Sequence, residues 1–185
     1  MKTIYFITEN ESKFQEAKLI LKKTGVKLLK KKIQLSEPKT LSQDEVVKSK
    51  ALQAYEKLKK PVIVDDTGIY FEEYKDFPGT HTKYLFKTIG FKGLQKLLFK
   101  AKKNAYFKTL ICYKDKSTTK IFSGVWKGII TTNISSSFNP DWQYNSIFIP
   151  EGFKKTLSEI SVDERIKHSH RRKALQKLMS WLKDE

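Results

Sequence analysis

The feature that most constrains the fold is a short β-branched run that leads directly into two acids. The run VIV at residues 62–64 predicts a central buried strand, because β-branched side chains on both faces suit a strand that is covered on both sides. Asp65-Asp66 and then Thr67-Gly68 follow it, so we expect the strand to end there, with the acids at its carboxyl end. Ligand crevices of open α/β sheets form at that edge. The sequence therefore predicts a ligand site beside the two acids.

The segments around this strand predict alternating strands and helices. Residues 4–7 predict a buried strand, and apolar residues at helical spacing follow it until Gly25. A capping box at residues 42–45 begins a helix that ends before Pro61, and a second capping box stands at residues 161–164. Further expected elements are a helix near 94–101, strands at 106–113 and 121–130 joined by a polar turn, and a last helix over 174–182. We expect a mixed, twisted α/β sheet with helices on both sides.

Length and composition set the outer limits. The chain has 185 residues, of which 39% are hydrophobic, enough for one sizeable core, so we expect a single domain over residues 1–185. Cys112 is the only cysteine, which excludes an intrachain disulfide. The start of the chain lacks the pattern of a signal peptide, and lysines interrupt every apolar stretch. We expect a cytoplasmic protein that does not enter membranes.

A strong positive charge suggests an anionic partner without identifying it. Lys+Arg 37 against Asp+Glu 20 gives a formal net charge of +17, which attracts nucleic acids, acidic membranes and nucleotides alike. Nearly all of the excess is lysine scattered along the chain, which favours a solvated surface over a dedicated nucleic-acid groove. The alternative is a nucleotide- or nucleic-acid-binding protein with little or no turnover. Acids discriminate between the two, because a metal-assisted hydrolase needs them and a polyanion-binding surface does not.

The acids and lysines could together support hydrolysis of a phosphoanhydride. That reaction needs carboxylates to hold Mg²⁺, cations to hold phosphate oxygens, and an oriented water. The polar loop at residues 8–13 ends at a helix N-terminus, where free N–H groups favour an anion. On spacing alone, paired acids are as often a turn or a cap, and single lysines in so basic a chain are usually surface residues. The candidate carboxylates are Glu37, Asp65 and Asp66, and the candidate lysines are Lys13, Lys50 and Lys83.

Six motifs occur in order along the chain. They are residues 8–13 (TENESK), Glu37 with Lys50, residues 65–68 (DDTG), residues 78–83 (PGTHTK), residues 148–152 (FIPEG) and residues 169–171 (SHR). From Thr8 to about Leu178 they resemble the inosine triphosphate pyrophosphatase family, in which the first motif reads T-G-N-x-x-K. The resemblance implies Mg²⁺-dependent hydrolysis of deaminated purine nucleoside triphosphates such as ITP, dITP and XTP to the monophosphate and pyrophosphate. It also implies two lobes about a long nucleotide-binding cleft, and a homodimer.

The resemblance also implies a role for each matched residue. Glu37 and Asp66 would bind the metal, and Asp66 and Asp65 would be catalytic. The alternative for Asp65 is that it contacts the metal ligands and not the metal itself. The implied substrate-binding residues are Thr8, Asn10, Lys13, Lys50, Thr67, Lys83, Trp142, Tyr144, Asn145, Arg165, Ser169, His170 and Arg171.

Three residues depart from the family pattern. Glu9 replaces a glycine in the phosphate loop, Asn145 replaces an acid that would face the base, and Arg165 replaces a lysine. An asparagine can both donate and accept hydrogen bonds, so the base preference is open. The neighbouring aromatics Trp142 and Tyr144 could stack on a purine or could be core residues. For the dimer surface, Trp126 and residues 129–130 are the candidates.

Overall fold

The computed structural model describes residues 2–133 and 140–184. Among these residues, no helix is both long enough and apolar enough to cross a membrane. The strands are β1 (Thr3–Ile7), β2 (Lys27–Lys31), β3 (Val62–Phe71), β4 (Asn104–Lys114), β5 (Thr119–Ile130) and β6 (Phe148–Pro150). The helices are α1 (Glu11–Leu21), α2 (Gln43–Leu58), α3 (Thr82–Leu97), α4 (Val162–His168) and α5 (His170–Asp184).

The strands form one mixed sheet in the order β2-β1-β3-β4-β5-β6. β1 pairs in parallel with both β2 and β3, whereas β5 and β6 are antiparallel. Asp115 closes the turn between β4 and β5, because its Oδ1 accepts hydrogen bonds from the main-chain N–H groups of Ser117 and Thr118. The prediction of a mixed α/β sheet is confirmed.

The expected end of the central strand at the acids is wrong. β3 continues through Asp65 and Asp66 to Phe71 because another apolar run, Ile69 to Phe71, is buried and stays extended. The parallel pairing of β3 with β1 nevertheless stops at Ile63. The acids therefore follow the end of the parallel ladder, although they do not follow the end of the strand.

The described chain divides into two compact units. Unit 1 contains Met1–Asp66, Thr109–Gly124 and His170–Glu185, and unit 2 contains Thr67–Lys108 and Val125–Ser169. Strands β3, β4 and β5 each contribute residues to both units. The single domain, the two lobes and the cleft stay predictions.

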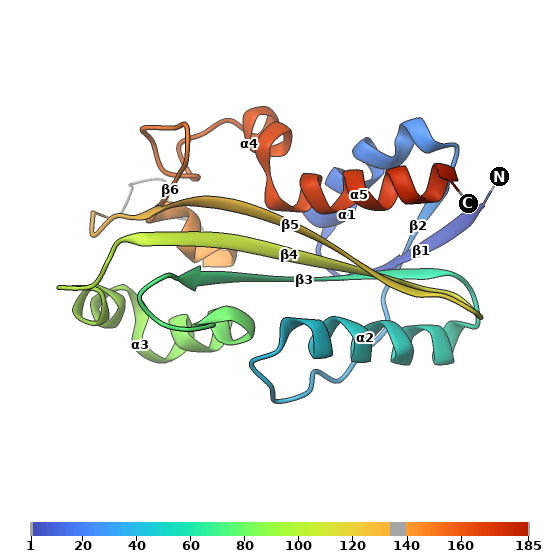
Figure 1. Ribbon diagram of the computed structural model, residues 1–185, viewed down its shortest axis with the longest axis horizontal. Coiled ribbons are helices and arrows are strands. Elements are labelled where there is room, and N and C mark those ends of the chain that lie inside the picture. Colours follow the sequence, from blue (N-terminus) through green and yellow to red (C-terminus); the bar gives the residue numbers. More distant parts are fainter. Residues whose placement is uncertain (1, 134–139, 185) are drawn as a thin grey trace. The chain divides into compact units, whose positions relative to one another are not determined.

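In unit 1, helices cover both faces of the sheet. Side chains alternate along β1, so that Ile4 and Phe6 join one apolar cluster and Tyr5 and Ile7 join another. The first cluster packs against α1 and α5, and the second packs against α2. Figure 1 shows α1 and α5 on one face and α2 on the other. This double covering explains why the VIV run of β3 is apolar on both sides.

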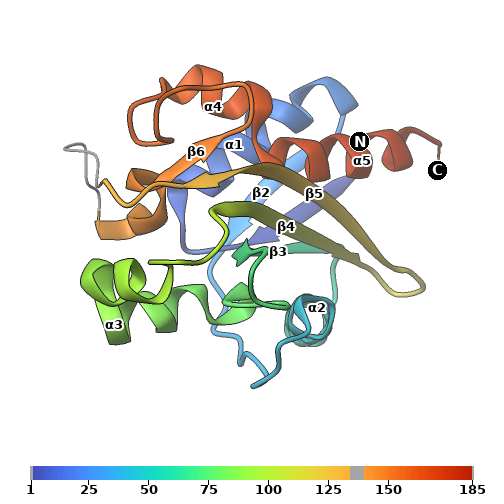
Figure 2. The same cartoon turned by 60° about the vertical axis from the view of Figure 1, so that its left-hand side comes forward.

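Unit 2 has an aromatic-rich core of its own. Helix α3 buries Leu94 against it, and Gly90 breaks that helix with a φ of +56°. Figure 2 shows α3 and α4 on opposite sides of the sheet. Of the candidate dimer contacts, Trp126 is only 4% exposed and packs against Phe153, and Ile130 is 3% exposed, which disfavours both, whereas Ile129 is 45% exposed.

Candidate active site

The loop before α1 is shaped by two predicted substrate residues. Oδ1 of Asn10 accepts a hydrogen bond from the main-chain N–H of Lys13 at 2.9 Å, which makes Asn10 the N-cap of α1. Oγ1 of Thr8 accepts from the N–H of Asn10 at 3.2 Å. These bonds explain why polar residues stand at positions 8 and 10. They also fix the start of α1, so that Lys13 lies in the first turn of this helix. Glu9 is exposed in the same loop.

Asp65 is buried between two cations. Nζ of Lys13 lies 3.1 Å from each of its carboxylate oxygens, and Nε of Arg171 donates to Oδ2 at 3.2 Å. Burial alone would raise the pKa of Asp65, but the charges of Lys13, Arg171 and Lys50 outweigh it and lower the pKa to about 2. Both oxygens of this carboxylate are engaged and its pKa is lowered, so it is better suited to holding Lys13 and Arg171 than to accepting a proton.

Glu16, which no sequence motif singled out, completes this buried network. Its Oε2 accepts a hydrogen bond from Nη1 of Arg171 at 2.6 Å, and both side chains are nearly buried. Glu16 lies one helical turn after Lys13, next to the buried Ala17, so it is an acid on the apolar face of α1. That placement was the available signal, because a buried acid normally has a charged partner.

Lys50, which lies in α2, is positioned near both Asp66 and Glu37. Its Nζ donates to Oε1 of Glu37 at 2.8 Å and to the main-chain oxygen of Asp65 at 3.2 Å, and Oδ1 of Asp66 lies 4.0 Å away. Burial alone would lower the pKa of Lys50, but the hydrogen bond to Glu37 and the charge of Asp66 raise it overall. Gln43, which was also not predicted, donates to the main-chain oxygen of Asp66 at 3.2 Å.

Asp66 has the chemistry of a ligand for a hard cation. Its Oδ2 is buried and has no hydrogen-bond partner among the residues that the structure describes. Burial raises the pKa of Asp66, so a nearby positive charge would stabilise its ionised form. Within the described residues no three His, Cys, Asp or Glu side chains gather into a metal site. Carboxylate oxygens such as those of Asp66 and Glu37 are the type of ligand that Mg²⁺ binds, usually one or two at a time, with water and phosphate as its other ligands.

His170 is held at the start of α5. Oγ1 of Thr109 lies 2.6 Å from its Nδ1, and both side chains are buried. Burial lowers the pKa of His170 well below its ordinary value, and the charges of Arg171 and Lys13 add to the effect, so the ring is neutral near pH 7. Gly124 allows this helix to approach β5, since a Cβ there would lie 1.9 Å from the main-chain oxygen of His170.

Among the predicted residues of unit 2, Tyr144 is the best defined. Its ring is 4% exposed and packs against Phe71 and Phe86, and its hydroxyl donates to the main-chain oxygen of Thr82 at 3.1 Å. This environment favours the core role over stacking on a base. Trp142 is also predicted to bind substrate, but its side chain lies outside the part of the chain that the structure describes.

The other predicted residues of unit 2 differ in exposure. Lys83 is exposed, Thr67 and Asn145 are half-buried, and Ser169 is buried at the C-cap of α4. Nε of Arg165 is buried without a hydrogen-bond partner among the described residues. A buried guanidinium donor of this kind is available for a ligand oxygen.

Two glycines of the matched motifs have a packing reason in unit 2. A Cβ on Gly68 would lie 2.5 Å from the main-chain oxygen of Gly79, and Gly79 itself has a φ of +50°. The glycines of DDTG and PGTHTK thus allow these two segments to touch. Their presence is explained without any contact to a substrate.

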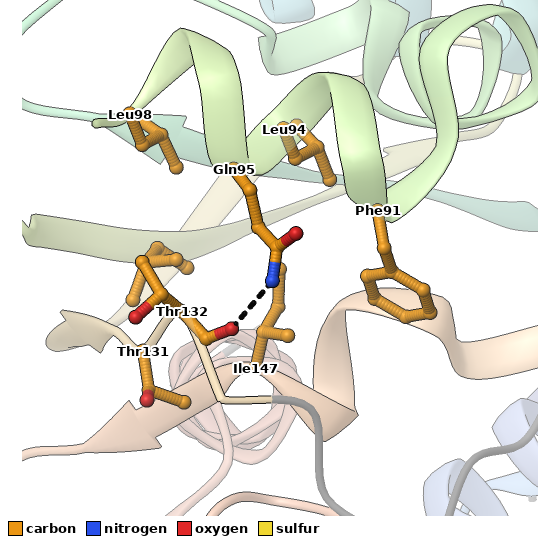
Figure 3. Close-up of a pocket in the computed structure, with 8 residues that line it drawn as sticks. Phe91, Leu94, Gln95, Leu98, Thr131, Thr132 and Ile147 are labelled. Atoms are coloured by element: carbon orange, nitrogen blue, oxygen red, sulfur yellow. Dashed lines mark hydrogen bonds between the residues drawn. The ribbon is translucent and has the colours of Figure 1, made fainter.

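Unit 2 also contains two hollows that differ greatly in size. Figure 3 shows the smaller one, of about 10 Å³, where Nε2 of Gln95 donates to the main-chain oxygen of Thr132 at 2.8 Å. It has room for about one water molecule. The larger, of about 450 Å³, is lined in part by residues 149–153. Among the described residues, none of the predicted substrate-binding side chains lines either hollow.

The protein has a mixed α/β fold. In unit 1, acids and lysines gather around the first part of strand β3, up to Asp66. The sequence model of the Ham1 family matches residues 4–181. The chain belongs to the Ham1 family.

Similar proteins cover nearly the whole chain. A dITP/XTP pyrophosphatase of Saccharolobus solfataricus is 36% identical over 177 residues, which are 95% of this chain and 91% of that protein. An inosine triphosphate pyrophosphatase of Yarrowia lipolytica is 32% identical over 187 residues, which are 99% of this chain and 97% of that protein. A Ham1 protein structure from Coxiella burnetii superposes with a TM-score of 0.86 at 21% identity and covers 100% of both chains, which supports the fold.

Proposed function

We propose that this protein is a Mg²⁺-dependent nucleoside triphosphate pyrophosphatase that hydrolyses ITP, dITP and XTP to the monophosphate and pyrophosphate. The pyrophosphatases named above support the reaction and the substrate class. The observation that carries the proposal is the buried carboxylate of Asp66, which has one oxygen without a partner among the described residues and another 4.0 Å from Lys50, the lysine that also binds Glu37. A surface that only binds polyanions gains nothing from such acids.

Each group of unit 1 then has a separate task. Glu37 and Asp66 would hold Mg²⁺, which when bound neutralises phosphate charge and lowers the pKa of a coordinated water. Asp66 would also orient the attacking water and accept its proton. Lys13 and Lys50 would contact phosphate oxygens, and Asp65 would keep Lys13 in place through the 3.1 Å ion pair.

Base recognition is assigned to the SHR motif together with Asn145 and Arg165. Arg171 already directs two of its donors at Glu16 and Asp65, which supports a role in holding the site together as well as any contact with the base. The free Nε of Arg165, within the described residues, could donate to a 6-oxo group. The proposal includes a homodimer, with the exposed Ile129 as a candidate contact. It also includes a reducing cytoplasmic location, which is consistent with the free, buried thiol of Cys112.

A single assay tests the proposal. Pyrophosphate release is measured from ITP, XTP, dITP, GTP and ATP, with Mg²⁺ and with a chelator. We expect Mg²⁺-dependent release of pyrophosphate from the first three and far less from ATP. Binding of these nucleotides without product would support the non-enzymatic alternative, and efficient cleavage of ATP would contradict the substrate class.

A further inference from the structure

The ammonium group of Lys50 lies among three oxygen atoms. They are Oε1 of Glu37 at 2.8 Å, the main-chain oxygen of Asp65 at 3.2 Å, and Oδ1 of Asp66 at 4.0 Å. Carboxylate and carbonyl oxygens are also the ligands that Mg²⁺ and Mn²⁺ prefer. In the nucleotide-free protein, a lysine thus brings a positive charge to the oxygens that the proposed function assigns to a metal.

We propose that Lys50 is a built-in competitor for the divalent cation. It neutralises Glu37 and Asp66 while the site is free of nucleotide, and these carboxylates bind metal tightly only after a polyphosphate has drawn the ammonium group away. The inference rests on the proposed function, which assigns the same lysine to phosphate. It adds an order of events, in which metal and nucleotide are bound together and metal alone is bound weakly.

The charges around the three groups explain the competition. Two carboxylates and one ammonium leave a single net negative charge, and Asp65 adds little because Lys13 and Arg171 already neutralise it. A divalent cation would also be repelled by the ammonium a few ångströms away. A polyphosphate offers this lysine several charged oxygens, and hydrogen bonds between charged groups are the strong ones.

Differences in side-chain exposure indicate which of the two carboxylates can move away from Lys50. The side chain of Glu37 is 58% exposed and lies outside the helices and strands, whereas Asp66 is 15% exposed and fixed on β3. The side chain of Lys50 is 16% exposed, so most of its length is held by the surrounding residues. Exchange of Glu37 for phosphate therefore requires only the movement of an exposed side chain.

The test measures Mn²⁺ binding to the nucleotide-free protein by electron paramagnetic resonance, in one buffer and at one pH for all variants. Lys50→Met removes the charge and keeps the apolar stem, and we expect the Kd for Mn²⁺ to fall at least about tenfold. Lys48→Met removes an exposed charge from the same helix and should leave the Kd within about twofold of the native value. Lys50→Arg keeps the charge and should retain weak binding.

Further variants locate the effect. Adding Glu37→Gln to Lys50→Met should abolish the gain in affinity, because a ligand is lost. If Lys50→Met failed to fold, as judged by circular dichroism, Lys50→Gln would answer the same question. An unchanged or weaker affinity in the folded Lys50 variant overturns the inference, even if the enzyme releases pyrophosphate. Absence of pyrophosphate release would remove the proposed function but would leave the Mn²⁺ measurement valid.

Discussion

The guanidinium group of Arg171 donates to Oε2 of Glu16 at 2.6 Å, through a contact between residues 155 positions apart in the chain. The same group donates to Oδ2 of Asp65 at 3.2 Å, which in turn pairs with Lys13. A single buried network thereby joins α1, β3 and α5. Its stability and its chemistry can be tested separately.

Glu16→Ala should destabilise the protein strongly, because it leaves the guanidinium of Arg171 buried with one partner fewer. Breaking a buried ion pair typically costs about 3–5 kcal/mol, and we expect the free energy of unfolding in urea to fall by that order. Glu11→Gln is the matched control, since Glu11 lies on the exposed side of the same helix and pairs with Lys30. Equal denaturation curves for the two variants would show that the network does not stabilise the fold.

Asp66→Asn should abolish turnover and leave the fold at least as stable as the native one. Burial raises the pKa of Asp66, so its stabilising contribution is complete only below the unfolded pKa of about 3.9 and is lost as the pH rises through the raised value. At neutral pH the ionised form therefore costs stability, and a neutral amide removes that cost. We expect pyrophosphate release to fall at least about 100-fold, with an unfolding midpoint equal to or above the native one. Native activity in this variant would contradict the site assignment.

His170 should make the protein sensitive to mild acid. Its folded pKa is depressed, so its contribution to stability is present above the unfolded pKa of about 6.5 and is lost as the pH falls below it. The free energy of unfolding should therefore decrease between about pH 7.5 and about pH 5, and the decrease should be smaller in His170→Gln. Urea titrations at several pH values measure both slopes. Parallel slopes would mean that another group sets the acid sensitivity.

Asn145→Asp should relax the selection against GTP. Guanine presents two donors, N1–H and the N2 amino group, and a carboxylate can accept from both, whereas an amide has one accepting oxygen and a donor that would face the amino group. ITP and XTP should be far better substrates than ATP in both proteins, because two donors facing an adenine amino group would lack acceptors. We expect the ratio of kcat/KM for ITP to that for GTP to fall about threefold to tenfold in the variant. Asn104→Asp, an exposed change in the same unit, should leave that ratio unchanged.

Local signals predicted most of the secondary structure. The N-caps of both predicted capping boxes are confirmed, since Oγ of Ser42 accepts from the N–H of Glu45 and Oγ of Ser161 accepts from that of Glu164. These contacts span three residues, so the sequence displays them directly. The juxtaposition of Lys13 with Asp65 was anticipated less directly, because only the matched motifs placed both at one phosphate site.

Contacts between distant segments were harder to predict. β3 was expected to stop at the acids because their polarity outweighed the apolar Ile69–Phe71 run that follows. The sequence near Thr109 does not indicate the contact with His170, beyond the fact that this threonine directly precedes the apolar run from Leu110 to Cys112. Tyr144 shows the same limit, since an aromatic residue beside a motif can pack inward as readily as it can meet a ligand.

The tight passage between Gly124 and the start of α5 bears on how natural variants of this protein would be interpreted. An alanine there would press a methyl group against the main-chain oxygen of His170, and the first turn of the helix would have to move. Arg171 would move with it and would lose its alignment with Asp65. A change of glycine to alanine is usually scored as mild, and position 124 has no polar chemistry. In a screen of variants it would nevertheless register as a loss of enzyme function.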